Sequence, residues 1–214
     1  MRQTTCAVLI ADVVGSRVRK NLRHSLAHTL ARASRKHLQE KLVLLPYAVT
    51  AGDEFQTIAF RPSAIPRILL DLRALFHPLS LRVGIGIGGV PGSIRPPVNR
   101  LTGEAFQSAR TAIDRVKGGN LFKFETLTAV TSPDPAFDEA VNLLYGLNDT
   151  LVRKVTPKQW ETIRAILQYP ALERSARHLR LDISTVSRNL KRGYYWQQSE
   201  TVKVAEKLFS RAFC

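Results

Sequence analysis

A long apolar run near the N-terminus constrains the fold of this chain most strongly. Residues 5–14 read TCAVLIADVV, with several β-branched side chains and a single carboxylate, that of Asp12. Such a run is typical of a central strand that is buried on both faces. Gly15 and Ser16 break the strand. Asp12 therefore stands at its end, where a carboxylate can face an open cleft while the strand is anchored in the core.

A second carboxylate occupies a comparable place. In YAVTAGDEFQTIAF, residues 47–51 and 55–60 predict two short strands that flank a tight turn of Gly52, Asp53 and Glu54. Two carboxylates on neighbouring strands can hold a divalent cation and a phosphate. Asp12 and Asp53 therefore predict a nucleotide-handling site in the first part of the chain.

Hydrophobic periodicity predicts the other elements of this part. The patterns favour helices over 18–43, 63–76, 104–116 and 133–147, and strands over 79–87, 121–124 and 127–131. The inward face of the first helix is expected to carry Leu22, Leu26, Leu30, Ala33, Leu38 and Leu42. This order of strands and helices indicates an α+β sandwich, one sheet covered by helices. Gly84, Gly86 and Gly89 fit G-x-G-x-x-G, but they lie inside a strand, so we expect them to let backbone or ligand approach the sheet closely.

The last part of the chain has a different character. After a linker at 146–156, Thr156 and Gln159 form a capping-box pattern, and helices are expected over 157–169, 172–179, 183–192 and 201–213. The helix over 183–192 should turn Ile183, Val186 and Leu190 inward. Its outer face then carries short hydroxyls and basic groups, which can meet base edges and phosphates. These DNA-binding candidates are Ser184, Thr185, Ser187, Arg188, Lys191 and Arg192.

The charge distribution agrees with a polyanion partner for this tail. The chain has 32 Lys and Arg against 17 Asp and Glu, a net charge of +15. Residues 151–214 hold 13 of the basic and 5 of the acidic side chains, so their charge density is more than twice that of residues 1–150. Double-stranded DNA is the expected partner. The two cysteines, the lack of a signal peptide and the lack of a long apolar span predict a cytoplasmic protein that does not enter a membrane.

Several motifs resemble known families. ADVVGS, AGDEFQ, LRVGIGIGG and GEAFQSAR occur in this order, as do the landmarks of class III nucleotidyl cyclases and, for GDEF, of diguanylate cyclases (GGDEF domains). The stretch around TVSRNLKR resembles bacterial helix-turn-helix domains. The whole chain is similar to the SatD family. The resemblance implies a ferredoxin-like, palm-type antiparallel sheet with helices over 1–148 and a small all-α helix-turn-helix domain over 149–214.

The resemblance also implies roles for individual residues. Asp12 and Asp53 match the ligands of Mg²⁺ or Mn²⁺, to which Val13 would add a backbone carbonyl, and Arg110 matches an arginine that stabilises the transition state. The nucleotide-binding positions are Val13, Gly15, Ser16 and Glu54. The chain departs from the cyclases at Phe106, where they carry an asparagine.

Three functions follow as hypotheses. The leading one is a bacterial DNA-binding regulator whose palm binds a nucleoside triphosphate or signalling nucleotide as a sensory or vestigial domain. The second is an active metal-dependent nucleotidyl cyclase or oligonucleotide synthase, and the third is a basic binding module without catalysis. By analogy with cyclases and with regulators that read two half-sites, we expect a homodimer.

Overall fold

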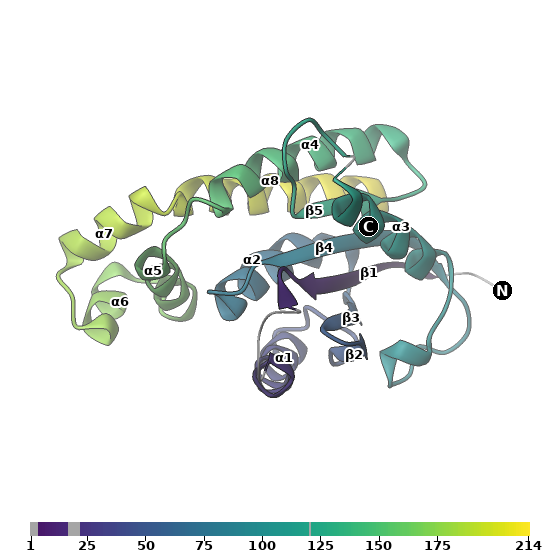
Figure 1. The fold of residues 1–214 in the computed structure, drawn as a ribbon, viewed down its shortest axis with the longest axis horizontal. Coiled ribbons are helices and arrows are strands. Elements are labelled where there is room, and N and C mark those ends of the chain that lie inside the picture. The colour runs from purple at the N-terminus through teal and green to yellow at the C-terminus, as the bar shows by residue number, and fades with distance from the viewer. Residues whose placement is uncertain (1–3, 17–21, 120) are drawn as a thin grey trace.

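The first part of the chain forms a five-stranded sheet with its covering helices, here called the sheet part (Figure 1). The computed structural model describes residues 4–16, 22–119 and 121–214. The strands are β1 (Thr4–Val13), β2 (Ala48–Ala51), β3 (Glu54–Ile58), β4 (Leu81–Val90) and β5 (Thr128–Thr131), and their order is β2-β3-β1-β4-β5. The pairs β2–β3, β3–β1 and β1–β4 are antiparallel, but β5 runs parallel to β4. The predicted antiparallel sheet is therefore mixed, and α3 (Glu104–Gly118) supplies the crossover that a parallel pair needs.

The central strand β1 is buried on both faces, as its sequence predicts. Ala7, Leu9 and Ala11 pack with α1 (Leu22–Gln39) and α2 (Ile65–Phe76) on one face. Val8 and Ile10 pack with α3 on the other. Asp12 follows the same alternation and therefore lies on the α3 side of the sheet.

Three glycines bring α3 unusually close to the sheet. Gly84, Gly86 and Gly88 alternate along β4, and a Cβ at any of them would overlap atoms of α3. At Gly86 the overlap is with the backbone of Ala105 and Ala109. The close approach expected at Gly84 and Gly86 is thus made by the backbone of a helix, and Gly88 adds a third position.

The helix α1 differs from its prediction toward its C-terminal end. It ends at Gln39, four residues before its predicted end, so Leu42 lies outside it. Leu26, Leu30 and Ala33 are buried as expected. Leu38, however, is 40% exposed, and its neighbour His37 takes the buried position. His37 can do so because its Nδ1 forms a hydrogen bond with the Tyr47 hydroxyl at 2.8 Å. The predicted start of this helix, at 18–21, lies outside the described residues.

Two other predictions, about residues between 121 and 156, are wrong. Residues 121–124 form bends instead of a strand. The expected linker at 146–156 is helical up to Val152, because α4 (Pro135–Val152) continues five residues past its predicted end at 147. The predicted boundary after residue 148 therefore falls within α4.

Four helices complete the chain: α5 (Pro157–Gln168), α6 (Leu172–Leu179), α7 (Ile183–Arg192) and α8 (Tyr195–Phe213). The capping box at α5 is confirmed, since the Gln159 side chain accepts a hydrogen bond from the Thr156 amide at 2.8 Å. α8 begins six residues before its predicted start and runs beside α4 back toward the sheet (Figure 1). Ala205 and Phe209 of α8 are fully buried in the same core as β1 and β4, so the last helix ties the tail to the sheet.

Candidate functional site

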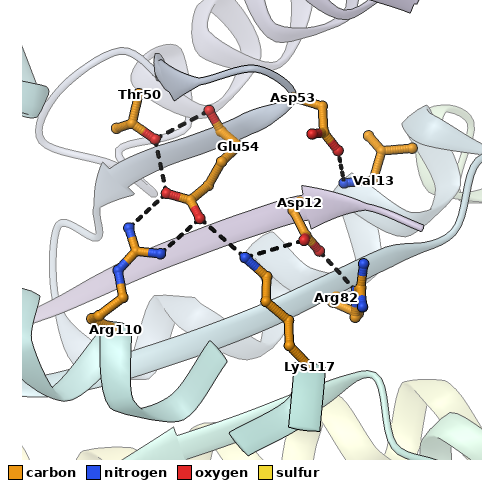
Figure 2. A network of polar contacts seen from close by, with 8 residues as sticks. All are labelled: Asp12, Val13, Thr50, Asp53, Glu54, Arg82, Arg110 and Lys117. Carbon is orange, nitrogen blue, oxygen red and sulfur yellow. Dashed lines mark hydrogen bonds and ion pairs between the residues drawn. The ribbon is translucent and has the colours of Figure 1, made fainter. Parts of the chain in front are cut away.

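A network of charged side chains surrounds the end of β1 (Figure 2). The Asp12 carboxylate accepts a hydrogen bond from Nε of Arg82 at 3.0 Å and lies 3.2 Å from Nζ of Lys117. The same Nζ lies 3.2 Å from Glu54 Oε2. Lys117 thus stands between the two carboxylates and bridges them.

Glu54 is held by further donors. Its carboxylate accepts two hydrogen bonds from the Arg110 guanidinium, at 2.7 and 2.6 Å, and a third from the Thr50 hydroxyl at 2.9 Å. This paired contact explains why the pKa of Glu54 is lowered to about 2 although burial alone would raise it. The same contact raises the pKa of Arg110.

The register of the sheet brings these residues together. β1 pairs with β3 so that Ala11 faces Phe55, and continuing this register places Asp12 opposite Glu54. On the other side, Asp12 is paired with Arg82 of β4. Arg110 and Lys117 are seven residues apart on α3, two turns of one helix face, and therefore both reach the cross-strand pair.

Asp53 lies in the hairpin turn and takes no part in the bridge (Figure 2). Its Oδ2 accepts a hydrogen bond from the backbone amide of Val13 at 2.9 Å. The contact fixes the hairpin to the end of β1. Glu54, which the resemblance gave only a nucleotide-binding role, is the acid that Lys117 links to Asp12.

The turn after β1 lies beside this network. Gly15 has a φ of +70°, in the left-handed region that favours glycine, and Ser16 follows it. Val14, the residue before them, lines a cleft of about 420 Å³. Three basic side chains, Arg82, Lys117 and Arg153, also line this cleft. Its one acidic wall residue, Glu125, is ion-paired with Arg153.

The donors at this site do not fit a divalent cation in the arrangement described. All four carboxylate oxygens of Asp12 and Glu54 already have a cationic partner. Mg²⁺ needs open oxygen ligands in near-octahedral geometry. Within residues 4–16, 22–119 and 121–214, no cluster of three or more His, Cys, Asp and Glu is placed to hold a metal. The metal roles of Asp12, Val13 and Asp53 stay predictions.

Sequence reasoning missed Arg82 and Lys117. Arg82 could be found only from the pairing of β1 with β4, which the sequence does not reveal. For Lys117 a signal exists in its seven-residue spacing from Arg110, although it lies one residue past the predicted end of that helix at 116. Phe106, which replaces the cyclase asparagine, is buried among Val8 and Ile10 and contributes to packing.

The pairing of Glu54 predicts a pH dependence of stability. The pKa of Glu54 is about 2 in the folded chain, against 4.5 for a glutamate without these partners. The stabilisation that the ionised Glu54 gives the fold is therefore complete above about pH 4.5 and is lost as the pH falls toward 2. We expect the free energy of unfolding to fall by on the order of 2 kcal/mol over this range from Glu54 alone.

Chemical denaturation at several pH values measures this effect. Glu54→Gln should be less stable than the wild type at neutral pH and should lose less stability on acidification. Glu139→Gln, at an exposed position on α4, is the matched control. If the curves of wild type and Glu54→Gln run parallel from neutral pH to pH 2, the pairing does not stabilise the fold.

A second cavity, of about 340 Å³, lies between α1, α2 and α5. Asp71, which lines this cavity, is buried. Its Oδ2 lies 2.6 Å from Nζ of Lys36 and 3.3 Å from Nε of Arg67. Nothing in the sequence singled out this cluster. Its ion pairs join α1 to α2, and we assign them a packing role.

The tail offers a separate candidate site, a nucleic-acid interface on α7. Val186 and Leu190 are fully buried against α5 and α6, which fixes the rotation of α7 about its axis. The opposite face is open to solvent. Of the six predicted DNA-binding residues, five are exposed and Thr185 is half-buried: Ser184, Thr185, Ser187, Arg188, Lys191 and Arg192.

One predicted core contact in this region is wrong. Ile183 is 46% exposed, and Leu181 in the preceding turn is 42% exposed. Ile183 is the first residue of α7 and lies three residues before Val186, at the edge of the buried face. The core of these helices depends instead on Trp160, Ile163 and Ala176, together with Ala74 and Leu127 from the sheet part.

No helix in the described part of the chain has the length and apolar character to cross a membrane. Both cysteines are free: Cys6 is buried in β1 and Cys214 is exposed at the C-terminus.

Several solved structures are similar to this fold, among them a cyclase domain, a GGDEF domain protein and a regulator. The dimeric guanylyl cyclase domain of a fusion protein from the fungus Blastocladiella emersonii is 15% identical, with a TM-score of 0.40 over 52% of this chain and 74% of that domain. An EAL/GGDEF domain protein from M. capsulatus is 18% identical, with a TM-score of 0.37 over 62% of this chain and 86% of its own. A regulator of polyketide synthase expression from Bifidobacterium adolescentis is 16% identical, with a TM-score of 0.37 over 99% of this chain and 82% of its own. At these identities the likeness concerns the path of the chain and gives no residue a role.

Family membership rests on the sequence. No curated protein matches this chain. The model of the SatD family matches residues 6–207, which include the charged network and all of the sheet and the tail helices except the first two residues of β1 and the last six of α8. The chain is a member of the SatD family.

Proposed function

We propose that this protein is a DNA-binding regulator in which α7 reads duplex DNA and the sheet part binds a phosphate-containing ligand. The observation that carries the proposal is the outer face of α7. Hydroxyls lie at its start and Arg188, Lys191 and Arg192 follow along it, all without an acidic neighbour on the helix. A helix of this composition, rigidly seated by its buried face, fits the major groove.

The packing around α7 supports this assignment. α6 and α7 are joined by a short turn in which Arg180 adopts a φ of +54°. Ala176, a small buried residue of α6, lets the two helices lie close together. Asn189 Nδ2 donates to Thr162 Oγ1 at 3.2 Å and so links α7 to α5. α7 is therefore supported on one side and free on the other, as a recognition helix must be.

The basic cleft supports the second half of the proposal. Arg82, Lys117 and Arg153 face it from β4, α3 and the end of α4, and a phosphate group is the ligand that such a set of cations attracts. A nucleoside triphosphate or a signalling nucleotide would supply that phosphate. The Gly15 turn beside the cleft offers backbone amides that could add to the binding.

DNA binding is tested with the double variant Arg188→Ala/Lys191→Ala. We expect its affinity for duplex fragments of the protein's own genomic locus to fall about 100-fold, because each lost base or phosphate contact costs on the order of 1–3 kcal/mol. Fluorescence polarisation of labelled fragments measures the loss. Both residues are exposed, so the variant should keep the wild-type unfolding curve.

A charge-matched control excludes a general effect of net charge. Lys207→Ala/Arg211→Ala removes two basic groups from exposed positions on α8, far along that helix from α7 (Figure 1). This control should bind DNA as the wild type does. Equal affinities of wild type and Arg188→Ala/Lys191→Ala would contradict α7 as the reader.

A further inference from the structure

We propose that the Lys117 ammonium takes the place of a divalent cation, so that the cleft binds phosphate without a metal. The inference rests on the phosphate-binding role proposed above. Its basis is the position of Nζ, 3.2 Å from Asp12 Oδ2 and 3.2 Å from Glu54 Oε2 (Figure 2). Two carboxylates that share one cation are the arrangement that a metal ion would otherwise complete.

The charge balance around Lys117 leaves little attraction for a second cation. Asp12 and Glu54 face the three cations Arg82, Arg110 and Lys117, and these five side chains together carry a net charge of +1. Asp114 also interacts electrostatically with Arg110. The Asp12 and Glu54 side chains are only 10% and 11% exposed, which weakens the screening of their interactions by water. A divalent cation could enter only if Lys117 withdrew.

The close packing of α3 keeps Lys117 in place. Gly84 and Gly86 let this helix rest on the backbone of β4, and Lys117 lies in its last turn. The Lys117 side chain is 30% exposed, and it also lines the cleft together with Arg82. Both cations thus contact Asp12 on one side and face the cleft on the other. They can bind the oxygens of a phosphate while their positions are fixed by the carboxylate.

Calorimetric titration with inorganic pyrophosphate, and then with ATP, tests the inference. Each titration is made once with EDTA and once with excess Mg²⁺. For the wild type we expect binding with EDTA that is at least as tight as binding with Mg²⁺. For Lys117→Met we expect a loss of about tenfold or more with EDTA, since a charge-assisted hydrogen bond is removed. Mg²⁺ should restore part of that loss, because the carboxylate oxygens are then open to it.

Three further measurements make the result unambiguous. Lys117→Arg keeps the cation and should keep metal-independent binding. Lys123→Met removes an exposed lysine from the segment after α3 and should behave as the wild type. Mn²⁺ titration followed by electron paramagnetic resonance should show bound Mn²⁺ with Lys117→Met and none with the wild type, and this readout does not need a nucleotide.

The outcomes separate the two proposals. If neither pyrophosphate nor ATP binds the wild type with EDTA or with Mg²⁺, the phosphate-binding role itself is wrong. If the wild type binds them only with Mg²⁺, or binds Mn²⁺ as tightly as Lys117→Met, the phosphate-binding role stands and the replacement of the metal by Lys117 is overturned.

Discussion

Gly86→Ala is expected to lower the free energy of unfolding by about 4 kcal/mol or more, beyond the range of most single substitutions. A Cβ at this position overlaps the backbone oxygen of Ala105 and the backbone nitrogen of Ala109, and neither atom belongs to a side chain that can turn away. α3 would have to lift off β4, which would also expose Val8 and Ile10. The loss is large because a whole helix–sheet interface shifts.

Urea denaturation measures the effect against Gly52→Ala. Gly52 has a φ of +62° in the hairpin turn but no atom near its missing side chain, so alanine there costs only about 1–2 kcal/mol of backbone strain. The comparison separates steric overlap from conformational strain. If Gly86→Ala and Gly52→Ala lowered the free energy of unfolding by similar amounts, α3 would not rest on the backbone of β4.

Asp149→Ala is expected to cost about 3–5 kcal/mol, since it leaves a buried charge without its partner. Asp149 lies fully buried in α4, and its carboxylate pairs with Arg73 of α2 and accepts a hydrogen bond from the amide of Leu127 at 2.7 Å. Arg73 also donates to Thr128 Oγ1 at 2.6 Å. One ion pair therefore joins α2, α4 and β5.

The exposed pair of Arg153 and Glu125 is the control for this prediction. The Glu125 side chain is 74% exposed, and Glu125→Ala should change the free energy of unfolding by less than about 1 kcal/mol. The double variant Arg73→Met/Asp149→Leu should recover much of the loss, because it replaces the pair by apolar groups. A loss below about 1 kcal/mol for Asp149→Ala would show that water or a new partner compensates Arg73.

The order of elements in the sheet part could be predicted from the sequence because each strand and helix has its own periodicity. The apolar run of β1, with Asp12 as its single carboxylate, and the leucine spacing of α2 are local properties. The parallel pairing of β5 with β4 could not be predicted, because it depends on the position and direction in which the chain leaves α3. The continuation of α4 to Val152 was missed because Gly146 and the polar residues Asn148 and Asp149 look like a linker, yet Asn148 and Asp149 are buried.

Only the part of the candidate site that depends on local sequence could be predicted. Asp12 could be singled out because it closes an apolar strand, but the partner predicted for it was Asp53. Glu54 entered only through the resemblance, as a nucleotide-binding position. The three basic partners of Asp12 and Glu54 come from β4 and α3, and only the tertiary fold places these cations over the carboxylates. The pairing of Arg110 with Glu54 also changes what Arg110 can do, since its guanidinium is already engaged. On α7, by contrast, helical periodicity alone separated the buried Val186 and Leu190 from the exposed Arg188 and Lys191.

The most direct test of the proposed regulator compares two duplexes under rising salt. One is a fragment of the protein's own genomic locus, and the other is the same fragment with its sequence shuffled. We predict that the wild type binds the native fragment at least about 10³-fold more tightly, and that both affinities fall linearly on a log–log plot against salt concentration. Equal affinity for the two duplexes at every salt concentration, or no binding to either, would contradict a regulator that reads DNA through α7.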